Sequence, residues 1–164
     1  MIHSAALPEF TFVDAAGHRQ TVQLAASAGR VRSVAEHLSG KVKAGSCVGL
    51  LYRSEADLVL NWLACLLAGL EPLILQYPTR KQSREYWLDS VRNTIGLTDL
   101  KAVIADEYCS GLGLQKLTTL VPNADIAALP EASAEPFTLD KFAIIQLSSG
   151  TTGSRKAIRF TSED

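Results

Sequence analysis

The stretch CVGLLYRSEADLVLNWLACLLAGLEPLILQ, residues 47–76, carries the pattern on which the fold depends. Its two apolar runs, residues 47–52 and 71–76, do not alternate with polar residues, and the segment between them predicts a helix over residues 55–68 that ends at Gly69. Parallel neighbours need a long crossover, and strands buried on both faces are apolar throughout. The stretch therefore predicts two parallel strands joined by a helix.

The same alternation of strands and helices continues on both sides of this stretch. Apolar residues spaced three or four apart predict two more helices, residues 24–38 and 82–95. One side of the second helix is expected to be apolar: Tyr86, Trp87, Val91 and Ile95. Further apolar runs predict strands, of which the last two are expected to be buried: residues 101–105, 117–121, 142–147 and 157–160.

Two regions depart from this alternation. Residues 10–13 and 20–24 alternate apolar with polar side chains around Gly17, which predicts a β-hairpin. Residues 122–136 are rich in alanine, proline and acidic residues and predict a surface connection. The fold class expected is α/β: a mostly parallel sheet flanked by helices on both faces, with an N-terminal β-hairpin.

Composition narrows the functional classes. The chain has 164 residues, 47% of them hydrophobic and 20% charged, so one globular domain is expected. The net charge of −1 is too small to gather nucleic acid, and the longest apolar run, residues 58–70, is too short to span a membrane. Three cysteines without a C-x-x-C pair and the lack of a visible secretory signal predict a cytoplasmic protein. No metal site is expected from His3, His18 and His37, because they lack ligand spacing.

The segment that carries chemistry is SSGTTGSRK, residues 148–156, between the last two predicted strands. Glycines let backbone N–H groups approach an anion, hydroxyls add donors, and Lys156 supplies a positive charge, so a polyphosphate is the ligand expected. A Walker-type P-loop has Ser or Thr after the lysine, whereas here Ala157 follows Lys156. A flexible linker is the alternative, although linkers do not usually lie directly between two apolar strands.

Residues 148–157 resemble the phosphate loop of the adenylate-forming enzymes, which reads Ser/Thr-Ser/Gly-Gly-Ser/Thr-Thr-Gly-x-Pro-Lys-Gly after a buried strand. The resemblance extends over residues 21–162 and includes Gly45-Ser-Cys-Val-Gly-Leu-Leu-Tyr52, where the family has Gly-Asp-x-Val and an apolar strand. The family, which includes acyl-CoA synthetases and fatty acyl-AMP ligases, implies an AMP-binding, ATP-binding ligase that activates a carboxylic acid as an acyl adenylate. A thiol, of CoA or of a phosphopantetheine carrier protein, then accepts the acyl group.

The resemblance also implies roles for individual residues. Lys156 is the catalytic residue, because it would stabilise the departing pyrophosphate. Magnesium would accompany the ATP. The residues expected to bind the nucleotide phosphates are Ser148, Ser149, Gly150, Thr151, Thr152, Gly153, Ser154 and Lys156.

Three positions at the end of the loop or just beyond it depart from the family pattern. Arg155 stands where the family usually has proline, and Ala157 where it has glycine. Arg155 adds charge but loses the fixed φ that a proline gives the end of the loop. A histidine often found just beyond would fall at Ser162. These changes put the expected activity in question more than the resemblance to the family.

Enzymes of this family are several hundred residues long, and their ribose-binding acid, substrate pocket and small C-terminal domain follow the phosphate loop. We therefore expect residues 1–164 to be the N-terminal portion of an AMP-binding domain, a fragment that ends just after the loop and does not catalyse adenylation alone. Two alternatives stay open: a non-catalytic, degenerate nucleotide-binding or interaction module, and one half of a split enzyme.

Overall fold

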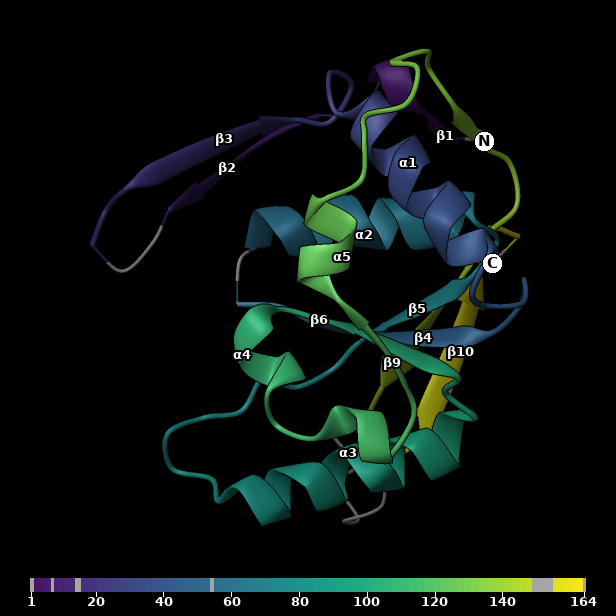
Figure 1. Cartoon of the computed structure of the whole chain (residues 1–164). Coiled ribbons are helices and arrows are strands. Elements are labelled where there is room, and N and C mark those ends of the chain that lie inside the picture. The colour runs from purple at the N-terminus through teal and green to yellow at the C-terminus, as the bar shows by residue number, and fades with distance from the viewer. Residues whose placement is uncertain (1, 7, 14–15, 54, 149–154, 164) are drawn as a thin grey trace.

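A six-stranded sheet forms the centre of the computed structural model, which describes residues 2–6, 8–13, 16–53, 55–148 and 155–163 (Figure 1). Four strand pairs are parallel, β4 with β5, β4 with β6, β5 with β9 and β6 with β7, whereas β10 runs antiparallel to β9. The predicted mostly parallel sheet is therefore confirmed. In spatial order the strands are β10 (Ala157–Thr161), β9 (Ala143–Leu147), β5 (Glu71–Ile74), β4 (Cys47–Leu51), β6 (Ala102–Ala105) and β7 (Thr119–Pro122).

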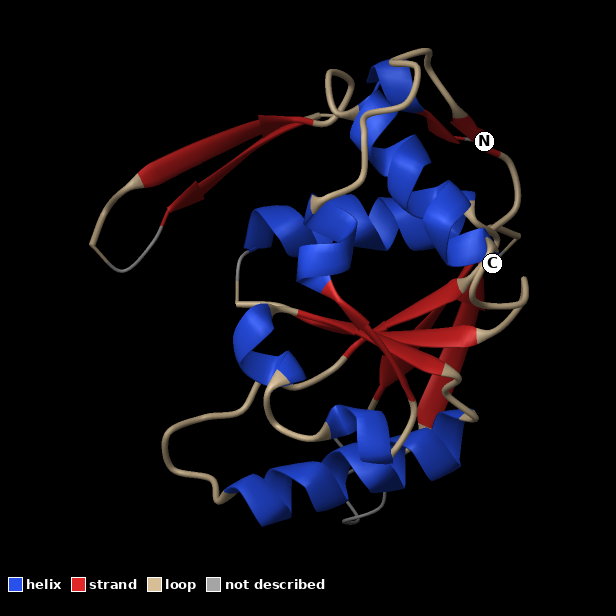
Figure 2. Cartoon of the chain, in the orientation of Figure 1, coloured by secondary structure: helices blue, strands red, loops and turns tan. Residues whose placement is uncertain are grey.

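Helices cover both faces of the sheet, as predicted (Figure 2). One apolar core lies between the sheet and the helices α1 (Ala28–Ser39), α2 (Glu55–Leu67) and α5 (Asn123–Ala127). A second core lies between the opposite face and α3 (Arg84–Thr98), α4 (Glu107–Ser110) and the 3-10 turn η2 (Leu114–Lys116). The doubly covered sheet explains why its central strands are apolar on both faces.

Strand β4 lies near the middle of the sheet, and all five of its residues are buried. Leu50 packs in the core below α1 and α2, while Leu51 packs in the core next to α3. Gly49 precedes them, and a side chain there would meet Leu75 and Leu100 of the core next to α3. Close packing on both faces thus explains the composition of the stretch from which the fold was predicted.

The predicted hairpin is formed by β2 (Glu9–Val13) and β3 (Arg19–Gln23), and Figure 1 shows it projecting from the body of the molecule. Phe10 and Phe12 stack on it with ring centroids 6.2 Å apart. A second small ladder was not predicted: β1 (Ile2–His3) pairs antiparallel with β8 (Thr138–Leu139), and the 3-10 turn η1 (Ser4–Ala6) follows β1. Strands of two residues are too short for a sequence pattern to reveal them.

Helix α3 corrects the expected packing of Tyr86. The helix begins after Ser83, whose hydroxyl accepts a hydrogen bond from the Tyr86 amide at 3.2 Å. Trp87 and Val91 are buried against the sheet, as predicted, but the side chain of Tyr86 is 65% exposed. Successive helical residues point about 100° apart, so Tyr86 and Trp87 cannot both face the sheet squarely. The first helix is also shorter than predicted, because α1 begins at Ala28.

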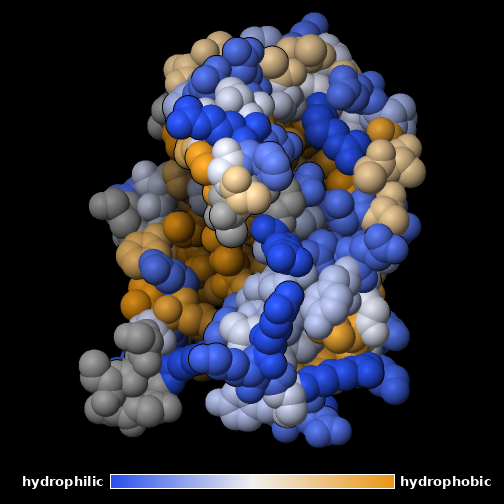
Figure 3. Space-filling model, turned by 90° about the vertical axis from the view of Figure 1, so that its left-hand side faces the viewer, coloured by the Kyte–Doolittle hydropathy of each residue, from blue (hydrophilic) through white to orange (hydrophobic). Residues whose placement is uncertain are grey.

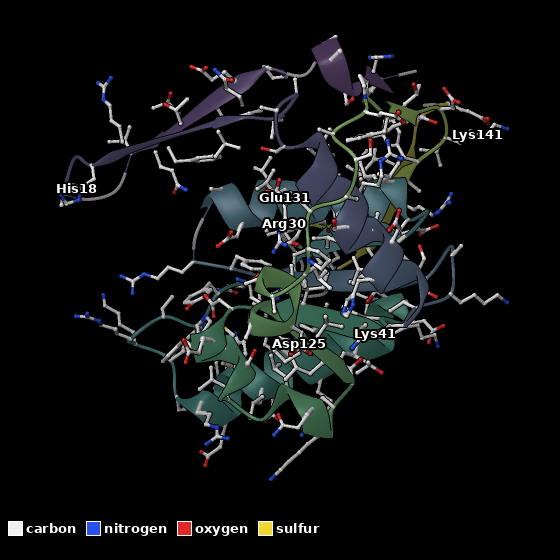
Figure 4. All side chains as sticks on the ribbon, turned by 45° about the horizontal axis from the view of Figure 1, so that its top comes forward. His18, Arg30, Lys41, Asp125, Glu131 and Lys141 are labelled. Atoms are coloured by element: carbon white, nitrogen blue, oxygen red, sulfur yellow. The ribbon has the colours of Figure 1, made fainter. Side chains whose placement is uncertain are left out.

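The segment predicted as a surface connection, residues 122–136, is in part a packed element. It contains α5, whose Ile126 is only 1% exposed. Arg30 of α1 donates hydrogen bonds to the carbonyl oxygens of Ile126 at 2.6 Å and Leu129 at 3.3 Å. Figure 4 shows Arg30 beside the chain that carries Glu131. A cation at the C-terminal end of a short helix stabilises it through contacts that no local pattern reveals.

The last two predicted strands are present but less buried than expected. In β9 only Ala143 is fully buried. In β10 no residue is fully buried, and Ile158 and Phe160 are 43% and 40% exposed. The side chains of β10 are exposed because β10 is an edge strand of the sheet.

The three cysteines are buried free thiols, which agrees with their predicted place in the core. Burial raises the pKa of the Cys47 thiol to about 11 and that of both Cys65 and Cys109 to about 12. Within the described ranges, no helix is both long enough and apolar enough to cross a bilayer.

Candidate phosphate-binding site

The parallel strands run in the same direction, and β4, β5 and β6 end on the left of Figure 1. The connections that follow β4 and β5 leave on opposite faces, through α2 and α3 respectively. Open α/β sheets bind ligands at the carboxyl ends of their strands, where such connections diverge. Figure 3, which views this side of the molecule, shows a hollow with hydrophobic residues at its surface. The topology therefore favours a ligand site at the carboxyl ends of these strands.

Ser148 and Lys156 lie opposite each other at the ends of β9 and β10. The Ser148 amide donates a hydrogen bond to the Lys156 carbonyl oxygen at 2.9 Å, and the Lys156 amide donates to Ser148 Oγ at 3.1 Å. The first bond extends the ladder by one position beyond the pair of Leu147 and Ala157. The two described members of the predicted site are thus held together by backbone groups and the Ser148 hydroxyl group, independently of the Lys156 side chain.

The Lys156 side chain is exposed, and within the part of the chain that the structure describes no carboxylate pairs with its ammonium group. The contrast with Arg159 on the same strand is clear. Arg159 binds Glu71 of β5 through both carboxylate oxygens, with Nη2 to Oε1 at 2.8 Å and Nε to Oε2 at 3.1 Å. Arg159 therefore connects the edge strand β10, across β9, to β5. The Lys156 ammonium group has no such ion pair among the described residues and is available to bind an anion.

Arg155 links this site to α3. Its Nη1 donates a hydrogen bond to Ser90 Oγ at 3.4 Å. Both residues line a cavity of about 350 Å³ together with Ser148, Trp87 and Thr94. Sequence analysis missed Ser90, because it lies 65 residues from Arg155 and belongs to no recognisable motif.

A larger cavity, about 670 Å³, lies where the chain leaves β4, β5 and β6. Tyr77 and Tyr108 stack there with ring centroids 6.1 Å apart, and burial and a hydrogen bond with Asp106 raise the pKa of Tyr77. Asp106 also accepts hydrogen bonds from the amides of Arg53 at 3.1 Å and Cys109 at 2.9 Å. Arg53, Tyr77 and Asp106 each directly follow a predicted strand, and this position is a sequence signal that could have grouped them.

Of the sequence-predicted site, the structure describes Ser148 and Lys156. It brings Ser148 and Lys156 together, while the other predicted phosphate ligands lie outside the described residues: Ser149, Gly150, Thr151, Thr152, Gly153 and Ser154. The basic side chains at the start of α3 are exposed: Arg80, Lys81 and Arg84. His18 lies near the tip of the projecting hairpin (Figure 4). In the described ranges no three His, Cys, Asp or Glu side chains are grouped so that they could hold a metal ion.

Comparison with known proteins places this site in context. A protein of Mycobacterium tuberculosis named "Putative ligase Rv1013" is 29% identical to the chain over 140 residues, which are 80% of this chain and 25% of that protein. The chain therefore spans about a quarter of the length of this relative.

Two solved structures show the same fold. A fatty acyl-adenylate ligase from L. pneumophila, in complex with acyl adenylate and pyrophosphate, superposes with a TM-score of 0.67 and 17% identity over 90% of this chain and 26% of its own. O-succinylbenzoate coenzyme A synthetase from Bacillus subtilis, in complex with AMP, gives a TM-score of 0.65 and 22% identity over 85% of this chain and 36% of its own. At these identities the likeness establishes the fold alone.

The family model described as "AMP-binding enzyme" matches residues 3–164, nearly the whole chain. It covers the described Ser148–Lys156 pair and the sheet that carries it. The chain belongs to the AMP-binding enzyme family.

Proposed function

We propose that this chain is the N-terminal, phosphate-binding portion of an AMP-binding domain, and that the enzyme it serves activates a carboxylic acid as an acyl adenylate. The observation that carries the proposal is the Lys156 ammonium group. It is exposed, has no carboxylate partner among the described residues, and lies opposite Ser148 at the carboxyl edge of the sheet. A fixed backbone with an uncompensated cation suits a polyphosphate. Membership of the AMP-binding family makes ATP the polyphosphate of choice.

In the proposed reaction a substrate carboxylate oxygen attacks the α-phosphorus of ATP. A new oxygen–phosphorus bond forms, the bond between the α-phosphorus and the bridging oxygen to the β-phosphate breaks, and pyrophosphate leaves with the bonding electrons. Lys156 stabilises the charge that develops on this leaving group. Ser148 would hold the β- and γ-phosphates through its hydroxyl group, together with the remaining ligands proposed from the sequence: Ser149, Gly150, Thr151, Thr152, Gly153 and Ser154.

Magnesium would accompany the nucleotide and would offset part of the charge on its phosphate oxygens. The second half-reaction transfers the acyl group to the thiol of CoA or of a phosphopantetheine carrier protein. The solved relatives support this range of chemistry, because one is a fatty acyl-adenylate ligase and the other a coenzyme A synthetase. Three unpaired thiols suit the reducing cytoplasm, where we place the protein.

The binding step can be tested on residues 1–164 by titrating MgATP and following the amide resonances of Ser148 and Lys156. We expect both resonances to shift, and Lys156→Ala to weaken binding by at least about tenfold, which corresponds to about 1.4 kcal/mol. Lys41→Ala is the matched control, because Lys41 is an exposed lysine that follows α1. Unshifted resonances in the folded wild-type chain, or equal effects of the two substitutions, would contradict the proposal.

The reaction itself is tested by exchange of labelled pyrophosphate into ATP. We expect carboxylate-dependent exchange with the longest polypeptide that the gene encodes, and none with residues 1–164 alone. Exchange by the short chain would show that the remaining family elements are dispensable. Its absence from the longest polypeptide, over a panel of carboxylic acids, would refute the proposed activity.

A further inference from the structure

We propose that Arg155 is a positioning residue for the phosphate-binding site, and that it acts through Ser90 of α3. The inference rests on the proposed function and deepens it, because it assigns a role to the position at which this chain departs from the resembled loop. The guanidinium group would restrain the backbone that leads into Lys156, and thereby the ammonium group that meets the phosphates. Arg155 itself would not bind them.

The geometry of Arg155 supports a tether to α3. Its Nη1 donates to Ser90 Oγ at 3.4 Å, from a side chain that reaches from the start of β10 to the middle of a 15-residue helix. That helix is firmly seated, since Trp87 and Val91 on either side of Ser90 are 2% and 4% exposed. The Trp87 indole also donates to the Gln76 carbonyl oxygen at 2.9 Å. Ser90 is therefore a fixed point, and a contact with it restricts the residue that precedes Lys156.

Arg155 and Lys156 differ in their described contacts. The Arg155 guanidinium group has a hydrogen-bond partner, Ser90 Oγ, and lines a cavity of about 590 Å³ with Asp89, whose carboxylate pairs with Arg92. The Lys156 ammonium group has neither a hydrogen-bond partner nor an ion pair among the described residues. We therefore assign the positioning role to Arg155 and the contact with the anion to Lys156.

The physical need for a tether follows from the sequence. The resembled loop has proline before its lysine, and a proline ring fixes φ near −65° without any contact. Arg155 has no such restraint, so the same ordering must come from elsewhere. On the Lys156 side, the backbone is held by the two hydrogen bonds with Ser148. The contact between Arg155 and Ser90 supplies the restraint on the preceding residue.

The test compares four variants of residues 1–164: Arg155→Ala, Ser90→Ala, the double variant and Arg155→Pro. Arg155→Ala and Ser90→Ala should each weaken MgATP binding about fivefold, about 1 kcal/mol for a charged hydrogen bond at the surface. The double variant should lose no more than either single one, because both remove the same contact. Arg155→Pro should bind MgATP within about twofold of wild type, since proline restores the restraint by another route. Ser39→Ala, at another helical serine, is the matched control and should have no effect.

Hydrogen exchange provides a readout that does not depend on nucleotide. The amides of Ser148 and Lys156 should exchange about fivefold faster in Arg155→Ala and Ser90→Ala, and at the wild-type rate in Arg155→Pro. Unchanged exchange in the first two variants would overturn the inference. So would equal losses of MgATP affinity in Arg155→Ala and Arg155→Pro with none in Ser90→Ala, because that pattern marks a direct phosphate ligand. A folded wild-type chain that binds no MgATP would instead refute the proposed function on which the inference rests.

Discussion

Substituting alanine for glycine at two positions should change stability in opposite directions. At Gly49, in β4, a Cβ atom would lie 2.5 Å from Leu75 Cδ1 and 2.9 Å from Leu100 Cδ1. At Gly96, in α3, a Cβ atom would meet nothing within 4 Å. Because the substitution is the same at both positions, the difference between their effects on the free energy of unfolding reports on the surroundings of each residue.

The magnitudes follow from these distances. Carbon atoms attract best at about 3.5–4.0 Å, so both leucine side chains would have to move by roughly 1 Å. Leu75 and Leu100 are 6% and 3% exposed and pack in the core next to α3, which leaves them little room. Overpacking costs about 1–3 kcal/mol, and the lower entropy of the unfolded alanine chain returns about 0.4–1 kcal/mol. Gly49→Ala should therefore destabilise by about 1–2 kcal/mol, and Gly96→Ala should stabilise by about 0.5–1 kcal/mol.

The assay is urea unfolding of residues 1–164, followed by far-ultraviolet circular dichroism. In a chain of this size, 1 kcal/mol shifts Tm by about 2–4 °C, so thermal unfolding should give shifts of opposite sign. A Gly49→Ala variant that is as stable as wild type would refute the packing described for β4. A destabilised Gly96→Ala variant would refute the placement of Gly96 in an open part of α3.

Two further predictions concern the edge strand and the thiols. Arg159→Ala should lower the free energy of unfolding by about 1 kcal/mol, because it breaks an ion pair with both carboxylate oxygens of the largely buried Glu71. Arg19→Ala on the exposed hairpin is the control for loss of charge. Equal effects of the two substitutions in urea unfolding would contradict the role of the pair. Burial raises the thiol pKa values above 9.0, so the folded state holds its protons more tightly, and stability should fall as pH rises from about 9 to 12. A thiol reagent at pH 8 should accordingly label Cys47, Cys65 and Cys109 much more slowly in the native chain than in the urea-unfolded chain. Equally rapid labelling of both chains, or a free energy of unfolding that does not change between about pH 9 and 12, would show that the thiols are not buried.

The sequence was sufficient to predict the central sheet, because its strands are buried on both faces and are flanked by helices. Residues 47–52 and 71–76 contain β4 and β5, and the helix between them is α2, which ends at Leu67, two residues before Gly69 with its φ of 68°. These elements are specified by local patterns and by the need to bury both faces. Local pattern and tertiary packing agree there, and the prediction was confirmed.

Elements that depend on distant contacts could not be predicted. Helix α5 is only five residues long, and Arg30, 96 residues from Ile126, contacts its C-terminal end. Tyr86 lies next to Trp87 on the helix, and only the docked orientation of α3 decides which of the two is buried. The exposure of β10 likewise depends on its place at the end of the strand order.

Some residues of the candidate site could be predicted from the sequence and others could not. Ser148 and Lys156 were predicted together because a hydroxyl-rich segment between two apolar strands is a local signal. Their backbone contact confirms that they are neighbours, and their role in phosphate binding stays a prediction. Ser90 could not be found, because only the packing of α3 beside the sheet brings it to Arg155.

The antiparallel course of β10 has a consequence for engineering. Its register with β9 is set by five residue pairs, from Ala157 with Leu147 to Thr161 with Ala143, and is closed by the bonds between Ser148 and Lys156. A residue inserted within β10 before Arg159 would turn the side chains that follow it to the opposite face of the sheet and would separate Arg159 from Glu71. Redesign of the ligand preference should therefore keep the present spacing of residues 157–161.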